Sequence, residues 1–338
     1  YIAKLMGYPA VVIMPEQMSA ERYERIRKYG GRLDLTPGSE SDVILVLERT
    51  EEYKKDSRNK VLAQFELMPN YRFHRYVTGG SAIDVARSYG NGRIAAFVSA
   101  PGSAGTLAAG DEIKAAFPDA LVCALEPREC STLFDNGRGT HRIEGIGDKM
   151  VTLIHNVLTT DHVMLIHDDD CVMGLELLEH QQPLIENILK LKRSALGFLR
   201  GVCGISGICN ILGAIRYAKQ RGLGSMENVV TIATDGFDRY PSVLMDLGRR
   251  KGPVSESTLR DWFESIFRGS SDDLLDIRPR EQKQRLFDYK QATWSKFGYS
   301  EQYLKSMQGQ AFWDAEYERI RQIDEQLAHT RQMAMSSS

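Results

Sequence analysis

A run of small and hydroxyl-bearing residues is the part of the sequence best suited to chemistry. It reads Val98-Ser99-Ala100-Pro101-Gly102-Ser103-Ala104-Gly105-Thr106-Leu107, and it follows an apolar run and precedes helix-like residues. Small residues let successive backbone amides converge on one point, and a helix N-terminus adds partial positive charge there. The hydroxyls of Ser103 and Thr106 can donate further hydrogen bonds. The segment therefore predicts a cradle for a phosphate dianion that needs no lysine or arginine.

Two other phosphate-binding motifs do not fit this run. It is not a Walker loop, because no Gly-Lys-Ser or Gly-Lys-Thr follows it, and the G-x-G-x-x-G spacing of dinucleotide-binding folds is absent. Taken alone, a small-residue turn between a strand and a helix is only a tight turn about as often as it is a phosphate-binding loop. The surrounding sequence has to decide between the two interpretations.

The turn belongs to an alternation of short apolar runs and helix-like stretches between residue 10 and about residue 250. Ser19 is expected to cap a helix that stops at Gly30 and Gly31. Strands that are apolar on both faces are typical of parallel sheets covered by helices on both sides. We therefore expect an α/β fold with open, mostly parallel sheets and right-handed crossovers. The predicted strands are residues 11–14, 94–98, 120–124, 163–166 and 229–233, and 32–35 could be another.

After about residue 250 the sequence becomes charged, helical and aromatic. This tail holds all three tryptophans, Trp262, Trp294 and Trp313. Its first helix has one apolar face, which we expect to dock on the parent domain. A contact with another subunit and a lid over the site are the alternative interpretations of this face. Residues 332–338 are expected to be a frayed end. The face is formed by Leu259, Trp262, Phe263, Ile266 and Phe267.

Composition narrows the class of protein. The 338 residues are 42% hydrophobic, enough for one large domain or two modest ones. A formal net charge of −2 and the lack of any apolar run of membrane-spanning length argue against nucleic acid and membrane as partners. The five cysteines contain no C-x-x-C pair, so we expect free buried thiols and a cytoplasmic location.

Five ordered segments resemble the cysteine synthase and cystathionine β-synthase family of fold-type II pyridoxal-phosphate enzymes. The small-residue run, residues 102–106, resembles the family's phosphate loop, G-T-G-G-T. The resemblance covers residues 1 to about 245, and the tail resembles, more weakly, that of a bacterial cysteine-synthase-like subgroup. The other four segments are Gly7 to Ser19 (G-Y-K-x-x-x-x-M-P-E-x-M-S), Gln64 to Gly79 (Q-F-x-N-P-x-N, H, T-T-G), Glu126 to Gly147 (V-E-P, then H-x-I-x-G-I-G) and Gly204 to Asn210 (G-I-S-S-G-A-N).

The resemblance implies pyridoxal 5′-phosphate as cofactor and a fold like that of the tryptophan synthase β-subunit, with a helical C-terminal extension. It implies that residues 1–60 are the remainder of a smaller α/β domain and residues 61–250 a larger, cofactor-binding α/β domain. Residues 251–331 would form the extension. The family's members are commonly dimers, so a homodimer is expected by analogy.

The resemblance also implies roles for individual residues. The phosphate would be held by Gly102, Ser103, Ala104, Gly105 and Thr106, with Ala104 where the family often has Gly. Gly204 would lie beside the cofactor. Gln64, Gly145 and Gly147 would line the substrate cleft.

Thr234 and Asp235 are expected to approach the pyridine nitrogen of the cofactor. When Arg239-Tyr240 is matched to the family's E-R-Y, Asp235 falls where many members have Ser. A carboxylate there would favour a protonated ring and a stronger electron sink. A shift by one residue would bring Thr234 there instead, and Asp235 could equally be a turn residue or helix cap.

The family's Schiff-base lysine lies in an S-x-K-x-R/N segment, and an S-x-G-N loop binds the substrate carboxylate. We expect both upstream of Tyr1, because the chain has no initiator Met and enters a strand-like run at once. No catalytic residue is therefore assigned within the chain, which we expect to be inactive on its own. Lys149 is nearest to the cleft by analogy, but it is interpreted as a surface lysine.

The expected reaction is β-replacement or β-elimination on a serine- or cysteine-type amino acid, as in cysteine biosynthesis. Two alternatives stay open: a non-catalytic homologue that binds phosphate or a partner protein, and a serine/threonine dehydratase-type lyase on the same fold. No metal site is expected. The run His167-Asp168-Asp169-Asp170 follows a strand, where capping of a helix is favoured over metal binding.

Overall fold

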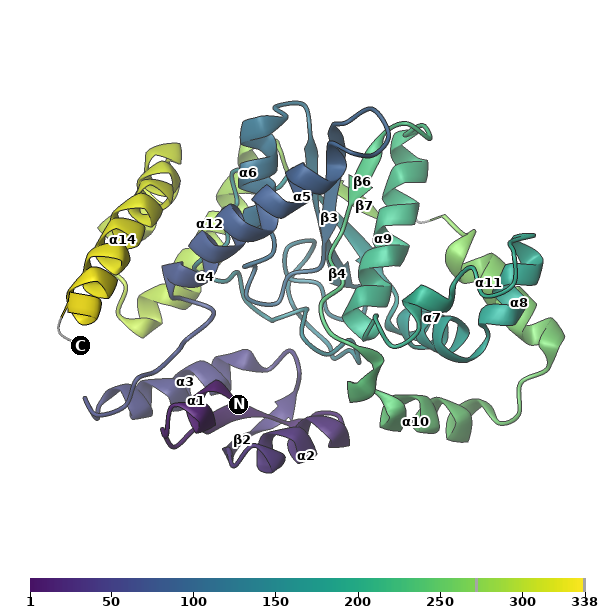
Figure 1. Cartoon of the computed structure of the whole chain (residues 1–338), viewed down its shortest axis with the longest axis horizontal. Helices are drawn as coiled ribbons and strands as arrows, with labels where there is room; N and C mark the ends of the chain where they lie inside the picture. Colours follow the sequence, from purple (N-terminus) through teal and green to yellow (C-terminus); the bar gives the residue numbers. More distant parts are fainter. Residues whose placement is uncertain (271–272, 337–338) are drawn as a thin grey trace.

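The computed structural model describes residues 1–270 and 273–336, which contain two sheets (Figure 1). The smaller sheet pairs two parallel strands, β1 (Val11–Gln17) and β2 (Arg32–Ser39). The larger sheet has the strand order β6-β3-β4-β5-β7, in which only β7 is antiparallel to its neighbour. Its strands are β3 (Ile94–Ser99), β4 (Leu121–Pro127), β5 (His162–Ile166), β6 (Asn228–Val230) and β7 (Leu274–Asp276).

Helices cover both faces of the larger sheet, as the apolar strands require. Every residue of β5 is buried. On one face, α9 (Ile205–Arg221) packs against β3, β4 and β5 and shares a core with α7 (Asp168–His180). On the other face lie α5 (Gly80–Ala86), α6 (Ala108–Ala116) and α12 (Arg280–Trp294) (Figure 1). The prediction of an α/β fold with a mostly parallel, doubly covered sheet is confirmed.

The smaller sheet is covered by two helices. These are α2 (Ala20–Lys28), which contacts β2, and α3 (Val43–Lys54), which contacts both strands. Ser19 does stand at the N-cap of α2, but its hydroxyl does not cap the helix. It donates instead to Glu144 Oε2 at 3.0 Å, and its amide donates to Glu144 Oε1 at 2.6 Å. The Ser19 hydroxyl thus serves as a donor to Glu144 and accepts no hydrogen bond from the amides of α2.

The remaining helices connect or extend these two layers. The chain enters through α1 (Ile2–Leu5), and α4 (Met68–Phe73) runs through a π-helical turn (His74–Gly79) into α5. The other elements are α8 (Gln182–Ile188), α10 (Pro241–Lys251), α13 (Glu301–Ser306) and the 3-10 turns Gly197–Leu199, Phe237–Arg239 and Ser295–Phe297.

The tail docks on the body of the protein. In α11 (Glu256–Phe267), Leu259, Phe263 and Ile266 are buried in the core that α7 and α9 share. The prediction that this apolar face docks on the parent domain is therefore confirmed. The last helix, α14 (Gln310–Ser336), buries Trp313 near its start and is exposed from residue 321 to 336. Residues 332–336 of the predicted frayed end are exposed and helical, whereas 337–338 lie outside the described residues.

Two features of composition can be checked directly. All five cysteines are buried and free. Within residues 1–270 and 273–336, no helix has the length and apolar character needed to cross a membrane.

Candidate functional site

The loop between β3 and α6, residues 102–107, keeps its backbone amides available. No carbonyl oxygen in the described ranges accepts a hydrogen bond from any of these amides. The amide of Gly105 has one partner, the hydroxyl of Ser103 at 3.3 Å. A run of unpaired amides at the start of a helix is the arrangement that binds an anionic oxygen cluster.

The carbonyl groups of the loop are held by neighbouring segments. Thr152 Oγ1 donates to the carbonyl of Ser103 at 2.8 Å, and the amide of Gly147 donates to that of Pro101 at 3.2 Å. In a trans peptide the C=O and the following N–H point in opposite directions. These two bonds therefore direct the amides of Gly102 and Ala104 away from the segments that hold the carbonyls.

The hydroxyl groups of the loop are placed as acceptors from the protein. Ser103 Oγ accepts from Asn70 Nδ2 at 2.9 Å, and Thr106 Oγ1 accepts from Ser99 Oγ at 2.9 Å. A hydroxyl that accepts from its neighbours still has its own proton to donate. Ser103 and Thr106 can each add a donor to the amides around them.

Close packing explains the small residues. A Cβ at Gly102 would stand 2.4 Å from the carbonyl oxygen of Gly145, so the loop touches the predicted cleft segment directly. A Cβ at Gly105 would stand 2.5 Å from Asn70 Oδ1. Ala104 has φ +67°, a left-handed conformation that glycine adopts at lower cost. This is the position where the related phosphate loops often carry glycine.

A cavity of about 340 Å³ opens beside the cleft segment. Gln64 lines it together with Glu40, Arg22 and Arg239. Glu40 Oε1 accepts from the amide of Gly145 at 2.8 Å. Burial, opposed by the charge of Arg22, raises the pKa of Glu40 to about 7. Gln64, Gly145 and the phosphate loop thus lie in one connected region, and Gly147 adjoins it through its bond to Pro101.

Gly204, Thr234 and Asp235 also come together. The amide of Gly204 donates to the carbonyl of Asp235 at 2.6 Å, and the hydroxyls of Thr234 and Ser206 lie 2.6 Å apart. The carboxylate of Asp235 accepts from Tyr240 Oη at 2.7 Å, and Arg239 lies 3.6 Å from it.

Asn210 ties this second group to the phosphate loop. Its Oδ1 accepts from the amide of Ala100 at 2.7 Å, and its Nδ2 donates to the carbonyl of Ile232 at 2.8 Å. Thr231 Oγ1 likewise donates to the carbonyl of Val98. Side chains therefore replace the backbone ladder after Val230, which is why β6 ends earlier than the predicted strand 229–233. Both groups of residues lie at the carboxyl ends of neighbouring parallel strands, where open α/β sheets bind ligands.

Three residues of the site had no role assigned from the sequence. Asn70 and Asn210 stand inside the motifs quoted above, so position in a motif could have identified them. Thr152 lies between the motifs Glu126 to Gly147 and Gly204 to Asn210 and carries no local signal. Only the fold brings it to the carbonyl of Ser103.

The other candidate groups have structural partners. Asp168 and Asp169 lie in the first turn of α7 and pair with Arg142 at 2.7 Å and 2.5 Å. Lys149 is half-buried rather than on the surface as expected, and it pairs with Asp42 at 2.7 Å rather than with a residue of the loop. In the part of the chain that the structure describes, no three His, Cys, Asp or Glu side chains gather as a metal site would require.

Comparison with known proteins agrees with this geometry. A family model described as pyridoxal-phosphate dependent enzyme matches residues 1–235. The cysteine synthase of Staphylococcus aureus is 27% identical over 243 residues, 72% of this chain and 71% of that protein. Cysteine synthase B of Campylobacter jejuni is 27% identical over 238 residues, 70% of this chain and 71% of its own.

Solved structures give the same match. The hydrogen sulfide-producing enzyme of Fusobacterium nucleatum has a TM-score of 0.60 and 26% identity, covering 82% of this chain and 75% of that one. The O-acetyl serine sulfhydrylase isoform 3 of Entamoeba histolytica has a TM-score of 0.59 and 26% identity, covering 78% and 71%.

Proposed function

This chain belongs to the family of pyridoxal-phosphate-dependent enzymes, with pyridoxal 5′-phosphate as cofactor, and from that premise we propose its reaction and its site. The reaction is β-replacement or β-elimination on a serine- or cysteine-type amino acid. Support comes from relatives named cysteine synthase and from a structural neighbour named for hydrogen sulfide production. The observation that carries the site is that no backbone carbonyl in the described ranges accepts from the amides of residues 102–107.

The proposed phosphate site fits a phosphate dianion. The amides of residues 102–107 and the hydroxyls of Ser103 and Thr106 supply donors on one side of the loop. Charge-assisted hydrogen bonds of this kind are roughly twice as strong as neutral ones. The N-terminus of α6 adds its partial positive charge, so the site needs no cationic side chain.

The bound cofactor supplies an electron sink that stabilises negative charge at the α-carbon of the substrate. The residues of the chain orient both molecules. Thr234 and Asp235 are proposed to face the pyridine nitrogen, where a carboxylate oriented by Tyr240 would hold a proton on the ring. An absorption spectrum of the loaded protein that is unchanged by Asp235→Ser would count against this contact.

The cavity beside Gly145 is proposed as the place of the amino-acid substrate. Gln64 lines it, and Gly145 adjoins it through the hydrogen bond of its amide to Glu40. Gly147 and Gly204 allow close packing nearby, because a Cβ would clash with His141 at Gly147 and with Asp235 at Gly204. We also propose the domain division predicted above: residues 1–60 belong to the smaller domain, 61–250 to the larger domain and 251–331 to the extension. The cavity would then lie at the junction of the two domains.

We propose that none of the lysines within residues 1–338 forms the covalent bond to the cofactor. Reduction of the 338-residue chain with borohydride in the presence of pyridoxal 5′-phosphate is expected to label no single lysine stoichiometrically. Stoichiometric labelling of one lysine between residues 1 and 338 would show this assignment to be wrong. In a protein that carries the cofactor-binding lysine, product analysis with cysteine, serine and O-acetylserine separates replacement, which yields a new amino acid, from elimination, which yields pyruvate and ammonia.

The phosphate site is tested by comparing pyridoxal 5′-phosphate with pyridoxal in a binding titration. We expect the phosphorylated ligand to bind at least about tenfold more tightly to the chain, a difference of roughly 1.4 kcal/mol. The double variant Ser103→Ala with Thr106→Val should lose most of that preference, whereas Ser81→Ala, in α5, should keep it. Equal affinity for the two ligands would remove the basis of the proposal.

A further inference from the structure

A segment of turns and irregular backbone, residues 151–160, runs between α12 and the phosphate loop, and we call it the strap. It belongs to no helix or strand, so its carbonyl groups have no backbone ladder to satisfy them. Side chains of α12 supply the missing donors. Trp294 Nε1 donates to the carbonyl of Val151 at 2.9 Å, Lys290 Nζ to those of Leu153 and His155 at 3.0 and 2.5 Å, and Lys283 Nζ to those of Val157 and Thr160.

These donors form one face of α12. Lys283, Lys290 and Trp294 are separated by seven and four residues, the spacing of side chains on one side of a helix. Lys290 is only 1% exposed and lies with its Nζ 5.5 Å from the ring centre of Trp313. Its hydrogen-bond partners are the carbonyl groups of Leu153 and His155 rather than carboxylates. A buried lysine without an acidic partner is costly, so a packing role alone would favour an apolar residue.

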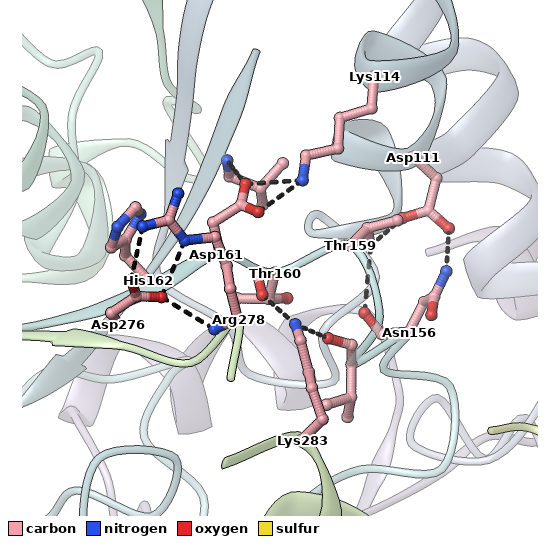
Figure 2. Close-up of polar contacts among 12 residues, drawn as sticks. Asp111, Lys114, Asn156, Thr159, Thr160, Asp161, His162, Asp276, Arg278 and Lys283 are labelled. Atoms are coloured by element: carbon pink, nitrogen blue, oxygen red, sulfur yellow. Dashed lines mark hydrogen bonds and ion pairs between the residues drawn. The ribbon is translucent and has the colours of Figure 1, made fainter. Parts of the chain in front are cut away.

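The opposite side of the strap holds the phosphate loop and its helix. Thr152 donates to the carbonyl of Ser103. Asn156 Nδ2 and Thr159 Oγ1 donate to the two carboxylate oxygens of Asp111, in α6, at 2.7 and 2.5 Å. Figure 2 shows Asp111 with Asn156 and Thr159 on one side of the strap and Lys283 bonded to it on the other. The carbonyl groups of the strap thus bind the extension, while its side chains bind the loop and α6.

We propose that Lys290 and Lys283 are positioning residues for the phosphate loop and that α12 thereby sets the affinity of the site for phosphate-bearing ligands. The lysines fix the path of the strap, and the strap fixes the direction of the Ser103 carbonyl and with it the Ala104 amide. The affinity part of this inference rests on the function proposed above. The mechanical part concerns the chain alone.

The first test follows backbone amide hydrogen exchange in the full 338-residue chain at residues 108–110, whose amides are bonded to the loop carbonyls of Gly105, Thr106 and Leu107. Lys290→Met and Lys283→Met are compared with Lys296→Met, the same substitution at an exposed lysine just after α12. We expect these amides, which report opening of the loop, to exchange about tenfold faster in the first two variants than in the control. Loss of the lysine's hydrogen bonds to the strap should make this local opening easier. Unchanged loop exchange in folded Lys290→Met and Lys283→Met would overturn the proposal.

The second test asks whether the lysines act through the strap. Affinity for pyridoxal 5′-phosphate is measured for Lys290→Met, Thr152→Val and the double variant, with Thr152→Ser as the conservative rescue of the hydroxyl. If Lys290 acts through Thr152, the two losses will be strongly non-additive and Thr152→Ser will restore binding. Additive losses would overturn the proposal.

If Lys290→Met does not fold, Thr152→Val still tests the proposal, because it removes the hydrogen bond between the strap and the carbonyl of Ser103. It should speed loop exchange relative to Thr152→Ser, and equal exchange in the two would overturn the inference. Failure of the wild-type chain to prefer pyridoxal 5′-phosphate over pyridoxal would count against the proposed function. The exchange result would still decide the coupling.

Discussion

Thr152 holds the carbonyl of Ser103 at 2.8 Å, and this bond fixes which way the phosphate loop faces. The peptide unit that joins Ser103 to Ala104 is planar and trans, so holding its oxygen on one side directs its N–H to the other. The amide of Gly147 does the same for the unit that joins Pro101 to Gly102. Hydrogen bonds to the carbonyl groups of the loop therefore determine the direction of its amides.

Gly102→Ala should disrupt the loop. A Cβ there would meet the carbonyl oxygen of Gly145 at 2.4 Å, a backbone atom that cannot move aside without shifting the cleft segment. We expect a loss of about 1–3 kcal/mol in the free energy of unfolding, typical of overpacking, and at least about tenfold weaker binding of pyridoxal 5′-phosphate. Chemical denaturation and a binding titration measure the two effects.

The control for this substitution is Gly80→Ala. A Cβ at Gly80 would meet nothing within 4 Å, and the residue lies in a helix, so alanine should be neutral or slightly stabilising there. If the two variants unfold at the same denaturant concentration and bind the ligand equally, the close contact between the loop and Gly145 affects neither stability nor ligand affinity.

Ala104→Gly should relieve strain. Ala104 has φ +67°, which costs a residue with a Cβ roughly 1–2 kcal/mol, whereas glycine loses about 0.5–1 kcal/mol through its greater freedom when unfolded. We expect a net stabilisation of up to about 1 kcal/mol, measured by denaturation, with affinity for pyridoxal 5′-phosphate kept. Ala109→Gly removes the same methyl group within α6 and should destabilise by about 1 kcal/mol or more. Destabilisation of both variants by the same amount would contradict this account.

Sequence patterns predicted the strands and the small-residue turn between β3 and α6 because both depend on local chemistry. The apolar run 163–166 could only be a buried strand in an alternating α/β chain, and β5 spans it. The glycines and hydroxyls of residues 102–106 stand next to one another in the chain. Their convergence needs only a tight turn before a helix.

Contacts between distant segments could not be predicted in the same way. Ser19 looks like a helix cap, yet Glu144, 125 residues away, takes its hydroxyl. Thr152 has no distinguishing neighbours, and its role depends on where the strap crosses the loop. The antiparallel strand β7 is only three residues long and too short for a periodic signal. In each case the information lies in tertiary packing.

Glu40→Gln should change how stability depends on pH. Burial raises the pKa of Glu40 to about 7 in the folded chain, above its value when unfolded. The wild type therefore loses stability through this group as pH rises from about 4.5 to about 7, because the folded state must give up a proton that it holds more tightly. The variant keeps the acceptor for the amide of Gly145 and has no such loss.

The difference in unfolding free energy, variant minus wild type, should thus grow by about 1–3 kcal/mol between pH 5 and pH 8. Denaturant titrations at both values measure it, and Glu48→Gln, at an exposed glutamate of α3, is the control. A difference that stays constant or shrinks with pH would show that Glu40 is not buried as a raised-pKa acid.

Lys290→Met should remove a gain in stability at alkaline pH. Burial lowers the pKa of Lys290 to about 7, so the folded chain releases this proton near neutrality, whereas the unfolded chain keeps it until about pH 10.5. Since the unfolded state then binds more protons, the wild type gains stability as pH rises through this window, and below about pH 7 the gain is absent. The variant has no lysine at this position and should lack the gain.

We expect the unfolding free energy of the wild type to rise by about 2 kcal/mol relative to Lys290→Met between pH 7 and pH 9. Two titratable groups lie nearby: His155, whose pKa burial lowers, and Lys283, whose pKa burial lowers to about 8. Both are present in the two proteins, so their contributions largely cancel in the difference. Lys296→Met should follow the wild type at each pH. Parallel pH profiles for wild type and Lys290→Met would mean that the lysine stays charged among the carbonyl groups of the strap, and that its hydrogen bonds repay the full cost of burying that charge.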